Sequence, residues 1–223
     1  MAERLREYGF DQVVEGVGRT GVVGVLKGRQ GDGSHSVGLR GDMDALPLQE
    51  VVDAKNTKGY ESKTPGVRHA CGHDGHTTIL LGAAKYLSAH RMEFAGTINV
   101  IFQPAEEGLA DANAMMEDGL FERFPCDEIY GLHNRPKLGL GKVNAFPCPR
   151  MAAADRFNIT VKGVGGHGAY PHLSKDPVVG AAQMIMSLQT VVSRSVSPMD
   201  AVFFPSHRWK GAKPRMSSQI KPA

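Results

Sequence analysis

Three short apolar stretches of the chain each run directly into a segment rich in acidic residues, histidine or glycine. Residues 36–40 lead into GDMDALP, residues 96–102 (GTINVIF) lead into QPAEEG, and residues 127–132 (DEIYGL) lead into His133. Such stretches are typical of β-strands. Because ligand sites in open α/β sheets lie at the carboxyl ends of strands, the pattern predicts such a sheet with a polar site at one edge.

A helical stretch separates two of these predicted strands. Residues 76–89 (HTTILLGAAKYLSA) carry apolar residues at helical spacing, with Ile79, Ala83 and Leu87 on one face. Strands that alternate with helices are typical of α/β folds with crossover connections. We therefore expect residues 1–150 to form one α/β domain, an open and mostly parallel sheet with flanking helices.

A different pattern begins near residue 150, after the two prolines of FPCPR. Residues 156–164 (RFNITVKGV) alternate as expected for a strand with one exposed face. Asp176 and Pro177 are typical of a helix start, and we expect that helix to run to about Ser193. The order of strand, glycine loop and helix indicates the start of a smaller α+β domain over residues 151–202.

Charge and composition exclude several classes of protein. Residues 206–223 hold five basic residues and no acidic one, whereas the remaining residues hold 21 basic and 23 acidic ones. A basic tail can bind nucleic acid, but no nucleic-acid-binding motif accompanies it, and we expect no such partner. Three cysteines are too few for a disulfide framework. With no apolar run approaching about 20 residues and no secretory signal pattern, we expect a cytoplasmic protein without a membrane partner.

The densest chemical signal is HACGHDGH, at residues 69–76. Cys71 and His73 lie two residues apart, and Gly72 and Gly75 allow the loop to turn tightly. Thiolate and imidazole groups are ligands of zinc and of neighbouring transition metals. The alternative is a polar loop whose histidines cap the following helix, but the density of the cluster favours a metal site.

Two further motifs follow predicted strands. Glu106 and Glu107 alternate sides where the chain is extended, so that one can face a metal ion and the other a substrate. A metal ion lowers the pKa of its bound water to about 7, and a free carboxylate then takes the proton. Paired glutamates are also common on solvated loops, and a lone histidine such as His133 is more often structural. Their shared position at strand ends makes all three candidates for one site.

Two more sets of residues leave their roles open. His167 lies in GVGGHGAYPH, where it could donate a hydrogen bond to a developing oxyanion or simply occupy a glycine turn. Asp42 and Asp44 could bind a metal ion directly or orient a ligand histidine. The motifs G-x-S-x-G and G-x-x-x-x-G-K-[ST] do not occur, which argues against a serine hydrolase or a phosphate-binding loop.

In this order the motifs resemble the bacterial and plant amidohydrolases that include hippurate hydrolases, N-acyl-amino-acid aminoacylases and auxin-conjugate hydrolases. The similar segments, from about Gly16 to Ala201, are RGDMDALPLQE, HACGHDGHTTILLGAAKYL, FQPAEEG, GLHN, MAAADRFNITVKGVGGHGAYPH and DPVVGAAQMIMSLQTVVSR. Related dinuclear zinc exopeptidases usually carry an aspartate in place of Cys71. The cysteine therefore favours aminoacylase-like hydrolases over carboxypeptidases.

The resemblance implies an incomplete zinc-exopeptidase-like catalytic domain that holds a divalent metal site of two ions, Zn, Mn, Co or Ni. The implied metal ligands are Cys71, His73, Glu107 and His133. Glu106 is implied as the general base that activates the attacking water. The histidine that matches His167 in related enzymes reaches the active site of a partner subunit and helps to hold the oxyanion.

The implied reaction is hydrolysis of the amide bond of a small N-acyl amino acid such as a hippurate-like substrate. A dipeptidase or carboxypeptidase of the same superfamily, or an inactive truncated fragment, are the alternatives. Residues 151–202 would act as a lid and dimerisation domain, so we expect a homodimer or homo-oligomer. Residues 203–223 (FFPSHRWKGAKPRMSSQIKPA) depart from the family pattern, and we interpret them as an atypical basic tail that comes from a frameshift or a truncated gene model.

Overall fold

A computed structural model describes residues 1–31, 33–52, 59–108, 111–145, 147, 157–197, 199 and 202. The chain divides into two compact units, Met1–Val143 and Asn144–Ala223, and each is described by itself. The predicted domain boundary near residue 150 and the predicted tail at residues 203–223 lie outside the described residues.

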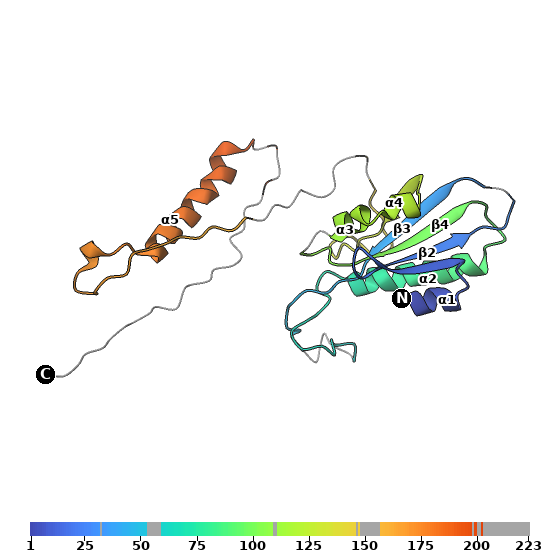
Figure 1. Ribbon diagram of the computed structural model, residues 1–223, viewed down its shortest axis with the longest axis horizontal. Helices are drawn as coiled ribbons and strands as arrows, with labels where there is room; N and C mark the ends of the chain where they lie inside the picture. The colour runs from blue at the N-terminus through green and yellow to red at the C-terminus, as the bar shows by residue number, and fades with distance from the viewer. Residues whose placement is uncertain are drawn as a thin grey trace. The chain divides into compact units, whose positions relative to one another are not determined.

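The first unit is built on a five-stranded sheet (Figure 1). Its strands are β1 (Gln12–Val17), β2 (Gly21–Lys27), β3 (Ser36–Asp42), β4 (Thr97–Gln103) and β5 (Glu128–Gly131), in the spatial order β1-β2-β4-β3-β5. β3 pairs parallel with β4 and β5, whereas β2 pairs antiparallel with β1 and β4. The predicted open α/β sheet with flanking helices is confirmed, but it is mixed rather than mostly parallel, because its pairings β1–β2 and β2–β4 are antiparallel.

The parallel pairing brings three carboxyl ends to one edge of the sheet. Asp42, the last residue of β3, pairs with Gln103, the last residue of β4. On the other side of β3, Arg40 pairs with Gly131, the last residue of β5. The segments that follow these strands therefore leave the sheet side by side, as the sequence pattern predicted.

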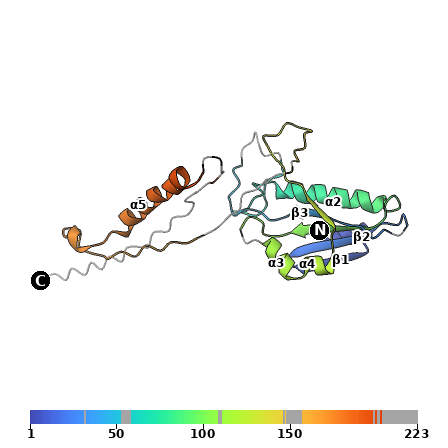
Figure 2. The same cartoon turned by 90° about the horizontal axis from the view of Figure 1, so that it is seen from above.

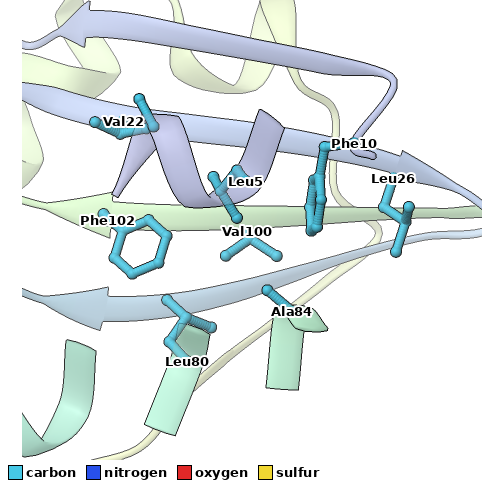
Figure 3. Packing of buried hydrophobic residues seen from close by; sticks show 9 residues of the cluster. Leu5, Phe10, Val22, Leu26, Leu80, Ala84, Val100 and Phe102 are labelled. Atoms are coloured by element: carbon cyan, nitrogen blue, oxygen red, sulfur yellow. The ribbon is translucent and has the colours of Figure 1, made fainter. Parts of the chain in front are cut away.

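Helices cover both faces of the sheet (Figure 2), because successive side chains of a strand point to opposite faces. The helices of the first unit are α1 (Ala2–Glu7), α2 (His73–Ala89), α3 (Asp111–Glu117) and α4 (Leu120–Arg123). On the face of α1 and α2 the core consists of Ala2, Leu5, Phe10, Val22, Leu26, Leu80, Ala84, Val100 and Phe102 (Figure 3). On the face of α3 and α4 it consists of Val17, Val23, Val25, Ile101, Met115, Leu120 and Phe124. No helix within the described ranges is long and apolar enough to span a membrane.

The helix α2 confirms the predicted helix and begins three residues earlier, at His73. Its buried residues are His73, His76, Leu80 and Ala84. Ile79, which the apolar spacing placed on the same face as Leu87, is 53% exposed. The residues that α2 buries therefore differ from the apolar face that the sequence predicted, because His73 and His76 of the HACGHDGH motif are buried in the first turn of the helix.

The second unit contains the helix α5 (Pro177–Thr190), which continues as the π-helical turn η2 (Val191–Ser195). The Asp176 carboxylate accepts a hydrogen bond of 2.8 Å from the backbone N–H of Val178, which confirms the predicted helix start. A short 3-10 helix, η1 (Pro171–Leu173), precedes it.

The predicted strand at residues 156–164 is wrong for the part that the structure describes. Residues 157–163 form no strand, and Val164 makes only an isolated bridge with Lys175. A strand requires a neighbouring segment for its backbone hydrogen bonds. No described segment pairs with residues 157–163 through backbone hydrogen bonds.

Leu5 fixes α1 to the sheet, and its truncation tests this packing. The side chain is fully buried, and a Cβ added at Gly24 of β2 would lie 2.7 Å from its Cδ1 atom. We expect Leu5→Ala to lower the free energy of unfolding in urea by about 2–5 kcal/mol. The exposed neighbour Glu3 is the control, and Glu3→Ala should change it by less than about 0.5 kcal/mol. Equal effects of the two variants would contradict this packing.

Candidate metal centre

Four segments meet at the carboxyl edge of β3, β4 and β5. Three of them are the segments at and beyond the ends of these strands, and the fourth is the loop that enters α2. Together they contribute Asp42, Asp44, Cys71, His73, Glu106, Glu107 and His133.

The structure brings together all four predicted metal ligands and the predicted base. Three groups have potential ligand atoms within 4.8 Å of one another, and each contains His73: Cys71, His73 and His133; His73, Glu106 and Glu107; Asp42, His73 and His76. The Cys71 Sγ atom lies 3.6 Å from His133 Nε2. His73 Nε2 lies 4.0 Å from Glu107 Oε1. His73 is therefore the centre of the cluster.

Asp44 determines which nitrogen of His73 is available to a metal ion. The Asp44 Oδ1 atom lies 3.0 Å from His73 Nδ1, and since a carboxylate only accepts, Nδ1 carries the proton and donates it. The lone pair is then on Nε2. Such a carboxylate–histidine pair is typical of histidines that bind metal ions.

Two buried atoms of the cluster have no hydrogen-bond partner among the described residues. They are His73 Nε2 and Glu107 Oε1. Buried polar atoms are nearly always paired, because an unpaired one loses its hydration without compensation. A divalent cation in contact with both atoms would supply the missing partner. The donor set of thiol, imidazole and carboxylate fits such an ion.

The turn between β4 and the two glutamates is held by Asp44 as well. Ala105 has a φ angle of 46°, in the left-handed region that residues with a Cβ seldom adopt. The backbone N–H of Glu107 donates a hydrogen bond of 3.0 Å to Asp44 Oδ2. One carboxylate thus fixes both a histidine of α2 and the loop that carries Glu107.

Asp42 and His76 form a second buried pair whose polar atoms are already used. The His76 Nδ1–H donates to Asp42 Oδ1 at 2.6 Å, and Arg40 Nη1 donates to Asp42 Oδ2 at 2.7 Å. The other ring nitrogen of His76 accepts a hydrogen bond of 2.9 Å from the backbone N–H of Asn134. The group of Asp42, His73 and His76 is therefore a poor metal site, and the geometry favours an orienting role for Asp42.

The charge state of Asp42 agrees with this role. Burial raises the pKa of its carboxyl group, but the hydrogen bond from His76 and the positive charge of Arg40 outweigh burial, so the pKa lies below its usual value. Asp42 is consequently a buried carboxylate that keeps its charge and remains an acceptor for both partners.

Gly72, between Cys71 and His73, is required by its conformation and by its surroundings. Its φ angle is 87°, and a Cβ at this position would lie 2.6 Å from Asn134 Nδ2. Only glycine allows this turn to approach the loop after β5 so closely. Sequence reasoning assigned no role to Asn134, although its position directly after His133 was the available signal.

The pKa of the Cys71 thiol reflects the negative charge of the cluster. Burial, the adjacent Glu107 carboxylate and the negative charges of Glu106 and Asp42 together raise its pKa to about 11. Such an accumulation of acidic groups is a favourable environment for a divalent cation.

His167 belongs to the second unit. Its Nδ1 atom accepts a hydrogen bond of 3.1 Å from the backbone N–H of Ala169, and its ring centroid lies 5.7 Å from that of Tyr170. The oxyanion role of His167 stays a prediction.

Comparisons with known proteins agree with this geometry. The sequence model of peptidase family M20/M25/M40 matches residues 38–208. A hippurate hydrolase of Campylobacter jejuni is 49% identical over 201 residues, which are 90% of this chain and 50% of that protein. An N-acetyl-L-cysteine deacetylase of Bacillus subtilis is 43% identical over 197 residues, which are 88% of this chain and 45% of that protein. The chain thus spans about half the length of these relatives.

Two solved structures share the fold. A protein from methicillin resistant Staphylococcus aureus has a TM-score of 0.66 at 32% identity, over 90% of this chain and 52% of that one. The YXEP protein of Bacillus subtilis, a dinuclear metal binding peptidase of the M20 family, has a TM-score of 0.55 at 37% identity. That match covers 62% of this chain and 37% of the other.

The pKa of Cys71 gives a test of the cluster in the metal-free protein. We expect the difference in far-ultraviolet thiolate absorbance between the wild type and Cys71→Ser to titrate at about 11. Glu107→Gln should lower this pKa toward the ordinary value of 9.0, because a negative charge that favours the protonated thiol is lost. Zinc should produce the thiolate at neutral pH, because a coordinating thiol loses its proton. An unchanged titration in Glu107→Gln would contradict the contact between the two side chains.

Proposed function

Because the chain belongs to peptidase family M20/M25/M40, we propose that it is the metal-binding part of an amidohydrolase that cleaves the amide bond of N-acyl amino acids. The observation that carries the proposal is the pair of buried, unpartnered atoms His73 Nε2 and Glu107 Oε1. They lie in one cluster with Cys71, His133 and a second glutamate, Glu106. A metal site with an additional carboxylate beside it is the arrangement that amide hydrolysis requires.

The metal ligands in this proposal are Cys71, His73, Glu107 and His133. A bound divalent ion supplies a water of lowered pKa and polarises the substrate carbonyl group. The dinuclear metal site of the similar YXEP protein supports two ions per site. The thiolate and imidazole ligands suit Zn, Mn, Co or Ni.

Glu106 is the general base and acid of the proposed reaction. It is more exposed than Glu107, which directs it to the side from which a substrate enters. Its carboxylate accepts a proton from the attacking water and then gives that proton to the nitrogen of the leaving amine. Glu107 and Glu106 thus divide the tasks of binding the metal and moving the proton.

The substrate class follows from the similar proteins and from Cys71. A hippurate hydrolase and an N-acetyl-L-cysteine deacetylase are among the relatives, and the names of both describe an acyl group joined to an amino acid by an amide bond. Cys71 occupies a position where related zinc exopeptidases usually carry aspartate. We therefore place the substrate among small N-acyl amino acids rather than free peptides.

The second unit has a role in the same proposal. We assign residues 151–202 to a lid and dimerisation domain, and we assign His167 the role of stabilising the oxyanion that forms during the reaction.

The proposed location is the cytoplasm. Cys71 and Cys126 are free cysteines, which fits a reducing environment.

The proposed base is tested by Glu106→Gln in chain loaded with Zn²⁺, Mn²⁺, Co²⁺ or Ni²⁺. We expect kcat for hippurate to fall by about 100- to 10,000-fold, because the proton acceptor is lost. Metal content, measured by elemental analysis, should equal that of the wild type. The control is Glu93→Gln, which changes an exposed glutamate outside the cluster and should leave kcat unchanged.

The substrate class is tested by comparing hippurate with the free dipeptide glycylglycine. The proposal predicts a higher kcat/KM for hippurate. A higher value for the dipeptide would assign the chain to a dipeptidase instead. Absence of hydrolysis with all four metals would contradict the proposed activity of this chain.

A further inference from the structure

His76 lies in the middle of a chain of buried and half-buried hydrogen bonds that starts in the sheet. The Arg40 guanidinium donates to Gln103 Oε1 at 2.8 Å and to Asp42 Oδ2 at 2.7 Å. His76 Nδ1–H donates to the other oxygen of Asp42 at 2.6 Å. With its proton on Nδ1, His76 accepts at Nε2 from the backbone N–H of Asn134 at 2.9 Å, and Nε2 also lies 2.9 Å from the side-chain amide of the same residue. The ring therefore joins the end of β3 to the loop that follows β5.

Asn134 passes this connection on to a proposed metal ligand. Its backbone carbonyl lies 2.8 Å from His133 Nδ1, which must donate because a carbonyl oxygen only accepts. The lone pair of His133 is then on Nε2, the atom that lies 3.6 Å from Cys71 Sγ. The backbone of Asn134 thus joins the two histidines: its N–H donates to His76, and its carbonyl oxygen accepts from His133.

The loop has little other support in the first unit. His133 and Asn134 are exposed, and all four residues of the preceding strand β5 are exposed too. His76, by contrast, is only 2% exposed, and its ring centroid lies 4.5 Å from that of His133. His76 therefore supports His133 in two ways, directly through this ring contact and indirectly through the hydrogen bond that its ring accepts from Asn134.

We propose that His76 is a positioning residue for the metal centre: it binds no metal ion but sets the metal affinity through Asn134 and His133. This inference rests on the proposed metal site. Partners that orient a ligand histidine typically change metal affinity by about 10- to 100-fold when they are removed. A purely structural alternative is that His76 serves only to satisfy the buried Asp42 carboxylate.

The two ring nitrogens allow these alternatives to be separated. In His76→Asn the shorter amide can replace Nδ1 and donate to Asp42, but it cannot reach Asn134. In His76→Gln the longer amide can replace Nε2 and accept from the backbone of Asn134, but it is misplaced for Asp42. The two variants therefore retain opposite halves of the connection and differ by a single methylene group.

The experiment is titration of the metal-free chain with Co²⁺, followed by its visible absorption. We expect His76→Asn to bind Co²⁺ about 10- to 100-fold more weakly than the wild type and to lose ligand-field intensity. His76→Gln should restore most of the affinity and the wild-type spectrum. The control is Thr77→Val, which removes another hydrogen bond between α2 and Asp42, of 3.1 Å to its backbone carbonyl, and should leave Co²⁺ binding unchanged.

The outcomes separate this inference from the proposed function. If the wild type binds Co²⁺ and both His76 variants bind it equally well, the inference is overturned and the metal centre stands. If both variants are weakened equally, or Asn is tolerated better than Gln, the role of His76 is confined to Asp42 and the inference is overturned as well. If the wild type binds no Co²⁺, both proposals are overturned. Circular dichroism of the metal-free variants shows that affinities are compared between folded chains.

Discussion

The parallel pairing of β3 with β4 on one side and β5 on the other is the constraint on which the site depends. Backbone hydrogen bonds set Asp42 opposite Gln103 and Arg40 opposite Gly131, so three strands end at the same edge. Each strand is followed by the residues that it contributes to the cluster. Since a shift of one residue turns every side chain to the opposite face, this register determines which side chains can meet there. The helix α2 and the loop that enters it place His73 and Cys71 at the same edge.

Charge compensation explains how so many polar groups are accommodated at this edge. Asp44 holds His73 with one oxygen and the backbone of Glu107 with the other, while Asp42 is held by His76 and Arg40. Neither aspartate therefore needs a metal ion to be satisfied. Within this cluster, His73 Nε2 and Glu107 Oε1 have no hydrogen-bond partner in the part of the chain that the structure describes, and both are ligand atoms suited to a cation. The two aspartates position the neighbouring side chains, and His73 and Glu107 remain available to bind a metal ion.

Much of this arrangement could be predicted from the sequence because its signals are local. Apolar runs ending in polar segments located β3, β4 and β5, and the motifs around Cys71, Glu107 and His133 identified ligand types. The division of labour between Asp42 and Asp44 could not be predicted, because it depends on contacts between residues 29 to 63 positions apart in the chain. The roles of His76 and Asn134 were missed for the same reason. The strand expected at residues 157–163 was wrong because alternation describes one strand and not the neighbour with which it must pair.

The central claim is that the cluster around His73 binds a metal ion through residues from the start of α2 and from the segments that follow β4 and β5. Anomalous diffraction from crystals soaked in Zn²⁺, recorded on both sides of the zinc absorption edge, tests it most directly. The claim predicts a zinc peak within bonding distance of His73 Nε2, with Cys71, Glu107 or His133 among its other ligands. A peak held by Asp42 and His76 instead, or the absence of any peak at this edge of the sheet, would contradict it.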